Sequence, residues 1–284
     1  MGFIYPSDYL IPNVMTSFSD ILQAAKFVEE QGYTYSLEKS WMQGRAIYGG
    51  LSTSLCLHGV LQQHPDLPPL RSVNVNFIGP ASPDVYVKSS VLRRGKSVAF
   101  IQGELWGEAG LITQAVFGFG AERKSRLDAV YSEPRQVIHL ERAEPFFPTE
   151  GPFSLEGGSR PAFTQHFEVR LIKGNRPFTG ANEPSFELWV KHKDAQAKGL
   201  LALVALADMS PPGVLPVFTE FAPISSLSWM FNLIKTDLSN ESGWWLMKTE
   251  AEHARHGYSS QDMKIWNDKG ELVVVGRQNV AIFY

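Results

Sequence analysis

Apolar and polar residues alternate along two stretches of the chain that resemble each other. Residues 102–119, "QGELWGEAGLITQAVFGF", align without a gap on residues 262–279, "DMKIWNDKGELVVVGRQN". The alignment places Trp106 on Trp266 and a glycine on a glycine. Alternation is typical of β-strands, and a glycine between two alternating runs indicates a tight turn. Each stretch therefore predicts a β-hairpin of the same shape.

The segments before these hairpins repeat as well. "SVNVNF" from Ser72 resembles "SLSWMF" from Ser226 in length and alternation. An apolar helix candidate precedes each of them, at residues 49–63 and at about residues 196–208, and two strand candidates precede each helix. We therefore predict that each half of the chain has the order strand, strand, helix, then four strands.

This order predicts how the protein buries its apolar residues. An antiparallel sheet of alternating strands has one face to bury, and one apolar helix packed lengthwise covers it. We therefore expect an α+β fold, a double hotdog, in which two antiparallel sheets each wrap around one central helix and join edge to edge. The composition of residues 121–160, rich in Pro and Gly at its end, suits a linker between domains at residues 1–120 and 161–284.

Composition narrows the class of partner. The chain has 284 residues, 44% of them apolar, and a net charge of −3 without basic blocks. Because nucleic-acid binding needs clustered Lys and Arg, we expect no nucleic-acid partner. The longest apolar run is far below the roughly 18 residues of a membrane helix, and the first ten residues lack the pattern of a signal peptide. We expect a cytoplasmic protein that binds a small molecule and no membrane, and the sequence leaves open whether it forms homo-oligomers.

One carboxylate stands in an unexpected place. The apolar run at residues 200–207 is followed by Asp208 and then by "MSPPG", which ends regular structure. A carboxylate at a helix C-terminus opposes the helix dipole by about 0.3–1 kcal/mol, so helix stability gives no reason for Asp208. Two interpretations are open. Asp208 is a turn residue before the prolines, as Asp often is, or it has a chemical role.

Four segments carry a resemblance to a known family: "GRAIYGGLSTSL" at the first helix, "LADMSPPG" after the second, "PISSLSW" at the start of a strand and "GELVVVGRQNVAIFY" at the end. In order and spacing they resemble the TesB-like acyl-CoA thioesterases of the double-hotdog type, from about residue 17 onward. The resemblance implies hydrolysis of an acyl-CoA to free acid and CoA, with no cofactor. It also implies a catalytic group of Asp208, Ser226 and Gln278, with Ser225 as the alternative hydroxyl.

Thioester hydrolysis suits these residue types. A positioned carboxylate contributes about 100- to 10,000-fold as the general base when water attacks the carbonyl carbon. The thiol leaving group has a reference pKa near 8.5, so it departs as thiolate with little help from an acid. Gln278 and the serine hydroxyl can each donate and accept hydrogen bonds, which suits them to orient the water.

"YGGL" at the start of the first helix predicts a substrate-binding segment. A helix N-terminus has free backbone N–H groups, and Gly49 and Gly50 would let a substrate approach the backbone beside Tyr48. The alternative is that the glycines merely let the helix pack against the sheet. The first half has Tyr48, Ser72 and Gly118 near the places that the catalytic group has in the second half, so we expect one site per chain.

Two other functions stay open. A hydratase or dehydratase of acyl thioesters uses the same fold but normally has a histidine near the aspartate, and "LADMSPPG" has none. A non-catalytic acyl-thioester-binding protein needs no such group. His253 and His256 have a spacing seen in metal sites, but they lie in a predicted strand, where residues i and i+3 face opposite ways. We therefore expect no metal.

Overall fold

The computed structural model describes residues 15–132, 135, 140–150 and 160–284. Its helices are α1 (Phe18–Gln23), α2 (Gly49–Gln63) and α3 (Gly199–Ala207), with 3-10 helices η1 (Lys39–Trp41), η2 (Leu140–Arg142), η3 (Ala162–His166) and η4 (Leu215–Val217). The strands before residue 121 are β1 (Lys26–Val28), β2 (Gly32–Ser36), β3 (Met42–Gln43), β4 (Ala46–Ile47), β5 (Leu70–Phe77), β6 (Asp84–Arg94), β7 (Val98–Gly107) and β8 (Gly110–Gly120). Those that follow are β9 (Glu144–Pro145), β10 (Phe167–Gly174), β11 (Ser185–His192), β12 (Ile224–Leu233), β13 (Trp245–Arg255), β14 (Tyr258–Trp266) and β15 (Leu272–Ile282).

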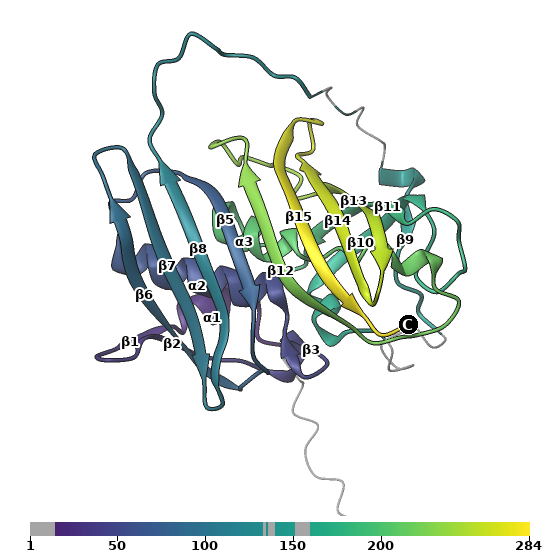
Figure 1. Ribbon diagram of the computed structural model, residues 1–284, viewed down its shortest axis with the longest axis horizontal. Helices are drawn as coiled ribbons and strands as arrows, with labels where there is room; N and C mark the ends of the chain where they lie inside the picture. The colour runs from purple at the N-terminus through teal and green to yellow at the C-terminus, as the bar shows by residue number, and fades with distance from the viewer. Residues whose placement is uncertain (1–14, 133–134, 136–139, 151–159) are drawn as a thin grey trace, which may run out of the picture.

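Within the described residues, thirteen strands form one antiparallel sheet that crosses the whole molecule (Figure 1). Their order is β1-β2-β6-β7-β8-β5-β12-β15-β14-β13-β11-β10-β9, and β3 and β4 form a separate pair. Apart from the edge strand β9, the second half repeats the order of the first half in reverse. The halves meet where β5 pairs with β12, so that edge of each half is covered. The predicted double hotdog, joined edge to edge, is confirmed.

The seam between β5 and β12 defines a pseudo-two-fold axis. Its antiparallel register is centred on the pair of Asn74 and Met230. A rotation that exchanges these two residues places Val73, one position before Asn74, on Trp229, one position before Met230. The axis therefore assigns each residue near the seam an equivalent in the other half.

The β-bulges obey the same axis. The register of β5 against β8 shifts between Leu70 and Ser72, and that of β12 against β15 shifts between Ser226 and Ser228. Counted from the seam, Leu70 corresponds to Ser226 and Ser72 corresponds to Ser228. A bulge is a built feature of a sheet, so its repetition supports the equivalence.

The two predicted hairpins, β7–β8 and β14–β15, also occupy equivalent places. Trp106 pairs with Tyr86 on β6, and Trp266 pairs with Leu246 on β13. The predicted correspondence of the two tryptophans is therefore confirmed. The turns differ: residues 108–109 join β7 to β8, whereas residues 267–271 join β14 to β15.

This difference corrects the gapless alignment beyond the turn. Leu105 lies opposite Thr113, whereas Ile265, its equivalent, lies opposite Val274. The second hairpin thus has one residue more in its turn than the alignment allowed. The prediction was wrong by one position there, because a glycine in each turn matched without a gap.

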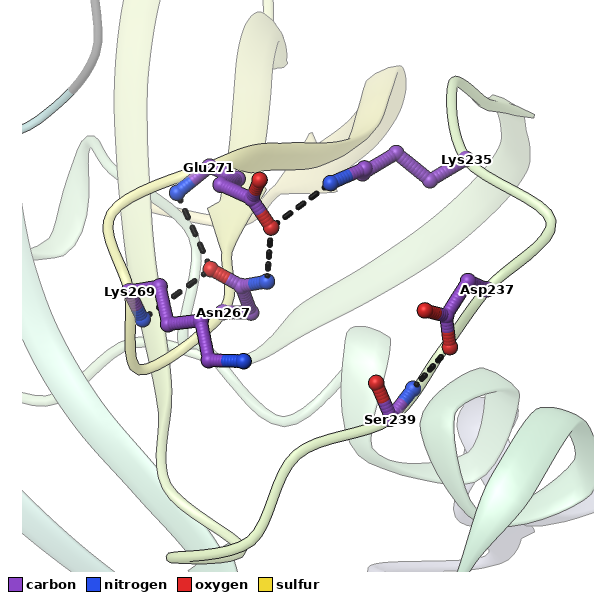
Figure 2. A network of polar contacts seen from close by, with 6 residues as sticks. All are labelled: Lys235, Asp237, Ser239, Asn267, Lys269 and Glu271. Carbon is purple, nitrogen blue, oxygen red and sulfur yellow. Dashed lines mark hydrogen bonds and ion pairs between the residues drawn. The ribbon is translucent and has the colours of Figure 1, made fainter.

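A polar network holds the longer turn (Figure 2). The side-chain oxygen of Asn267 accepts hydrogen bonds from the backbone N–H of Lys269 at 3.1 Å and of Glu271 at 2.9 Å. The Asn267 amide donates to the Glu271 carboxylate at 2.7 Å, and Lys235 reaches the same carboxylate at 2.6 Å. Asn side chains commonly close turns in this way. The network therefore links the turn to the loop after β12.

Helices α2 and α3 pack against each other on one face of the sheet (Figure 1). The Ser54 hydroxyl on α2 donates to the Leu201 carbonyl on α3 at 2.9 Å, and the Tyr48 hydroxyl donates to the Ala205 carbonyl at 2.6 Å. Residues 49–60 of α2 are buried on every side, because the sheet covers one face and α3 covers another. Both helices belong to one continuous apolar core.

The segment predicted as a linker contributes to the sheet edge. In β9, Pro145 pairs with Arg170 and Glu144 pairs with Leu171. The division into domains at residues 1–120 and 161–284 stays a prediction. Among the helices of the described residues, none has both the length and the apolar character needed to cross a bilayer.

Candidate functional site

Asp208 lies between the two helices. It is the first residue after α3, and its carboxylate lies against the first turn of α2, because a Cβ added to Gly49 would come within 2.5 Å of Asp208 Oδ2. The first turn of α2 has no acidic residue of its own. A helix N-terminus favours a nearby negative charge, so Asp208 opposes the dipole of its own helix but complements that of α2. This arrangement explains why a carboxylate stands at this point.

Gln278 connects Asp208 to Ser226. It comes from β15, and its side-chain Nε2 donates to Asp208 Oδ1 at 2.9 Å and to Ser226 Oγ at 3.1 Å. An amide nitrogen carries two hydrogens, so both are used. The structure thus brings together the three residues that the resemblance implied.

The structure also distinguishes the two candidate hydroxyls. Ser226 is half-buried on the face of β12 that carries Gln278 as a neighbour, whereas Ser225 is exposed. Successive residues of a strand point to opposite faces of the sheet, so only one of the two serines shares a face with the Gln278 side chain, although both line a neighbouring cavity. Ser226 is the hydroxyl in contact with Gln278.

Burial changes the acidity of Asp208. The surrounding protein raises the pKa of this carboxyl to about 7, and the hydrogen bond from Gln278 and the N–H of Gly50 oppose the rise. Burial raises a carboxyl pKa because it disfavours the charged form. A carboxylate whose pKa lies near neutrality is suited to act as a general base.

A further glutamine belongs to this group, and the sequence alone gives no sign of it. Gln261 on β14 pairs across the strands with Gln278, and its Nε2 donates to Gln278 Oε1 at 2.7 Å. Its own Oε1 accepts from the backbone N–H of Gly213 at 2.8 Å. Two glutamines paired on a buried face indicate a polar site. This pair can be recognised only when the register of β14 against β15 is known.

Tyr48 and Gly50 are not placed as the sequence analysis expected. Tyr48 is fully buried, its ring stacks on Phe163 at 4.0 Å, and its hydroxyl donates to a backbone carbonyl of α3. A Cβ on Gly50 would lie 2.2 Å from the Ala205 carbonyl oxygen. Packing against α3 and Phe163 therefore accounts for the places of both residues, and their contact with substrate stays a prediction.

Gly49 differs from Gly50 because it borders a cavity. Two cavities share Asp208 and Ser226 as wall residues. We call the first the aromatic cavity; it measures about 680 Å³ and its walls include Phe147, Ala162, Phe163, Phe178, Phe221 and Gln278. We call the second the seam cavity; it measures about 790 Å³ and its walls include Ala46, Gly49, Phe77, Ile78, Ile112 and Thr113. Both have the size of typical small-molecule sites.

The first half has no polar residues at the positions equivalent to Gln278 and Ser226. Val73 pairs with Phe117 on β8, and Trp229, the equivalent of Val73, pairs with Gln278 on β15. Phe117 is therefore the equivalent of Gln278, and Leu70 that of Ser226. The sequence predicted Ser72 and Gly118 instead. Gly118 is displaced by one residue because of the longer turn, and Ser72 corresponds to Ser228, two residues after Ser226, because the similar strand segments were matched two residues out of register.

Tyr48 was likewise no equivalent of Asp208, since it precedes α2 whereas Asp208 follows α3. Both first-half equivalents, Leu70 and Phe117, are buried apolar residues. The expectation of one site per chain agrees with this geometry.

Family models match most of the chain. The model of the acyl-CoA thioesterase N-terminal domain matches residues 37–120, and that of the acyl-CoA thioesterase C-terminal domain matches residues 141–282. The chain belongs to the acyl-CoA thioesterase family. Membership of this family confirms the resemblance to the TesB-like thioesterases and the expected acyl-CoA thioesterase function.

Solved structures agree on the fold. A hot dog fold protein of unknown function from Alicyclobacillus acidocaldarius superposes with a TM-score of 0.80 at 19% identity, covering 94% of this chain and 98% of its own. Acyl-CoA thioesterase II TesB2 from Mycobacterium marinum gives a TM-score of 0.69 at 16% identity, with 94% and 98% covered. Comparison with curated proteins gives no match.

The hydratase or dehydratase alternative receives less support. A dehydratase domain, that of RzxB from Pseudomonas fluorescens, superposes with a TM-score of 0.50 at 12% identity, covering 88% of this chain and 94% of its own. In the described part of the chain, no histidine lines either cavity. No cluster of three metal-ligating side chains is found among the described residues.

Proposed function

We propose that the protein hydrolyses an acyl-CoA with Asp208 as the general base for the attacking water. The contact of Gln278 Nε2 with both Asp208 and Ser226 carries this proposal, because it holds a carboxylate and a hydroxyl at one point of the cavity wall. Ser226 Oγ accepts from Gln278, so its own hydrogen is available to the water or to the thioester.

In this proposal the thioester group lies beside the wall residues that the two cavities share. Asp208 and Ser226 line both cavities, so a carbonyl carbon beside them has the acyl group on one side and the CoA arm on the other. The aromatic cavity has the larger share of aromatic walls and suits the acyl chain. The seam cavity then takes the pantetheine arm of CoA.

The reaction follows from these positions. The oxygen of water attacks the carbonyl carbon while Asp208 takes a proton from it. Gly49 is the first residue of α2, so its backbone N–H has no acceptor within the helix and can donate to the carbonyl oxygen as negative charge develops. The tetrahedral intermediate then breaks its C–S bond. CoA leaves as thiolate and takes up the proton that Asp208 accepted from water, which restores the base, and the free acid is released.

Thiol release from a panel of acyl-CoAs tests the proposal. Wild-type protein should release free CoA thiol, and Asp208→Asn should lower kcat about 100-fold or more with KM nearly unchanged, since the lost interaction acts mainly in the transition state. Gln278→Ala should lose less, because it holds the base without taking the proton.

Other outcomes would contradict the assignment. A change in double-bond absorbance without thiol release would support the hydratase or dehydratase alternative. Binding of acyl-CoA without either reaction would support a non-catalytic binding protein. If Asp208→Asn leaves thiol release unchanged but lowers the melting temperature, Asp208 is a structural turn residue.

Two further features stay predictions. We expect a cytoplasmic location and no nucleic-acid or membrane partner. Whether copies of the chain associate is open to measurement by sedimentation.

A further inference from the structure

A chain of hydrogen bonds runs from the end of the "LADMSPPG" segment back to its beginning. The backbone N–H of Gly213 donates to Gln261 Oε1, Gln261 Nε2 donates to Gln278 Oε1, and Gln278 Nε2 donates to Asp208 Oδ1. These bonds measure 2.8, 2.7 and 2.9 Å. Asp208 and Gly213 are the two ends of one loop, so the chain closes a ring.

The direction of every bond in this ring is fixed by its first donor. A backbone N–H can only donate, so Gly213 requires the oxygen of the Gln261 amide to face it. The nitrogen of Gln261 must then point to Gln278, which turns the oxygen of Gln278 toward it. Gln278 therefore presents its nitrogen, and not its oxygen, to Asp208 and Ser226.

The first donor is itself held in place. A Cβ on Gly213 would lie 2.8 Å from the backbone N of Ala251 and 3.0 Å from the Pro184 carbonyl oxygen, so close packing fixes the loop there. The prolines at 211 and 212 have no N–H, which leaves Gly213 as the donor at this end of the loop.

We propose that Gln261 is a positioning residue for thioester hydrolysis, which locks the amide of Gln278 in the orientation that holds Asp208 and Ser226. It lies outside both cavities' walls, so it acts through Gln278 and not on the substrate. The inference rests on the proposed function of Asp208.

The locked orientation affects the acidity of Asp208. A donor on the carboxylate favours its charged form, whereas a reversed Gln278 would place an oxygen against it. Tyr48, the residue before α2, is a titratable group close to Asp208, and burial raises its pKa well above its usual range, so it stays neutral. Asp262 and Arg277, the neighbours of Gln261 and Gln278 in sequence, pair with each other on the other face of the sheet.

Two substitutions at Gln261 test the proposal through opposite pH trends. Gln261→Met keeps the length of the side chain but removes both hydrogen bonds, so Gln278 can turn. We expect kcat to fall about 10- to 100-fold with KM changed less than about 3-fold, because the loss is one of positioning. The acid limb of the pH profile of kcat/KM should move to higher pH. The loss of activity relative to wild type is therefore largest at low pH.

Gln261→Glu should show the reverse trend. When the introduced carboxyl is protonated, it accepts from Gly213 and donates to Gln278, so the chain is kept and the activity relative to wild type stays within about 3-fold at acid pH. When it is ionised, it cannot donate, and Gln278 must turn. The deficit should therefore grow as pH rises.

Parallel pH profiles for wild type and both variants would overturn the inference, since a merely structural role changes stability without changing their shape. If Gln261→Met does not fold, Gln261→Glu alone tests the inference. An activity loss that grows with pH supports it, and a loss that is the same at every pH overturns it. Asp208→Asn is measured beside them. If it lacks activity while both Gln261 variants match wild type, the proposed function stands and the role of Gln261 falls.

Discussion

The two halves of the sheet differ in chemistry at cross-strand pairs that the pseudo-two-fold axis makes equivalent. Ile101 pairs with Phe117 in the first half, and Gln261 pairs with Gln278 in the second. The exposed fractions are 0% and 0% for the first pair and 2% and 7% for the second, so burial is nearly the same. The same fold thus buries an apolar pair in one half and two amides in the other.

This difference shows how the second half accommodates polar groups inside a core. A buried amide without a partner costs about 1–3 kcal/mol, so each polar group needs a partner. Gln261 and Gln278 satisfy each other, and the remaining bonds lead to Gly213, Asp208 and Ser226. The first half keeps the apolar core, and the second half carries a connected polar network around one carboxylate.

The largest effect on stability should come from placing glutamines at the first-half positions equivalent to Gln278 and Gln261. Phe117→Gln removes a fully buried ring and buries an amide without a partner, so we expect a loss of about 3–5 kcal/mol in the free energy of unfolding. Denaturant unfolding measures it. Adding Ile101→Gln gives the amide a partner, and the double variant should lose at least about 1 kcal/mol less than the sum of the single losses. Strict additivity would contradict the pairwise account.

A smaller effect separates the activity of Asp208 from its stability. The native pKa of about 7 lies above the value near 3.9 of an unfolded Asp. The stability that this proton contributes is fully present below about pH 4 and is lost as pH rises through about 7. Asp208→Asn does not titrate, so its stability relative to wild type should rise by about 2–3 kcal/mol between pH 5 and pH 8.

Activity should change in the other direction, because the base must be ionised. We expect kcat/KM of the wild type to rise with pH through a midpoint near 7. Chemical denaturation of both proteins at each pH, beside thiol release, makes the comparison. A constant stability difference, or activity independent of pH between 5 and 8, would show that Asp208 is not the titrating base.

The sequence predicted the fold because period and order are local features. The alternation of residues 102–119 and 262–279, and the apolar run before Asp208, each reflect burial of one face. Asp208 could be identified from the sequence for the same reason, because a carboxylate directly after an apolar run is also a local feature. The seam between β5 and β12 then followed from the need to cover strand edges.

What the sequence did not predict depends on register. Gln261 stands in "YSSQDMKIW", an ordinary strand sequence, and its role appears only when β14 lies opposite β15. One residue more in the turn moved the equivalent of Gln278 from Gly118 to Phe117. The contacts of Gly50 and Tyr48 with α3 could not be predicted either, because they join segments far apart in the chain.

The smallest expected effect concerns the two cavities on either side of Asp208. Ala162 lines only the aromatic cavity and is half-buried, and Ala46 lines only the seam cavity and is exposed, so each tolerates a larger side chain. If the acyl chain occupies the aromatic cavity, Ala162→Trp removes room for its distal methylenes. Each buried methylene contributes about 0.8 kcal/mol, so loss of two should raise KM about 10-fold for long acyl chains and leave short ones unchanged.

Ala46→Trp is the matched control, because all acyl-CoAs share the CoA arm. Its effect on KM should be the same for every chain length, measured by thiol release across a series from short to long acyl groups. The opposite result, chain-length dependence in Ala46→Trp and a uniform effect in Ala162→Trp, would exchange the roles of the cavities. Asp208 and Ser226 would keep their place at the junction in either case, because both residues line both cavities.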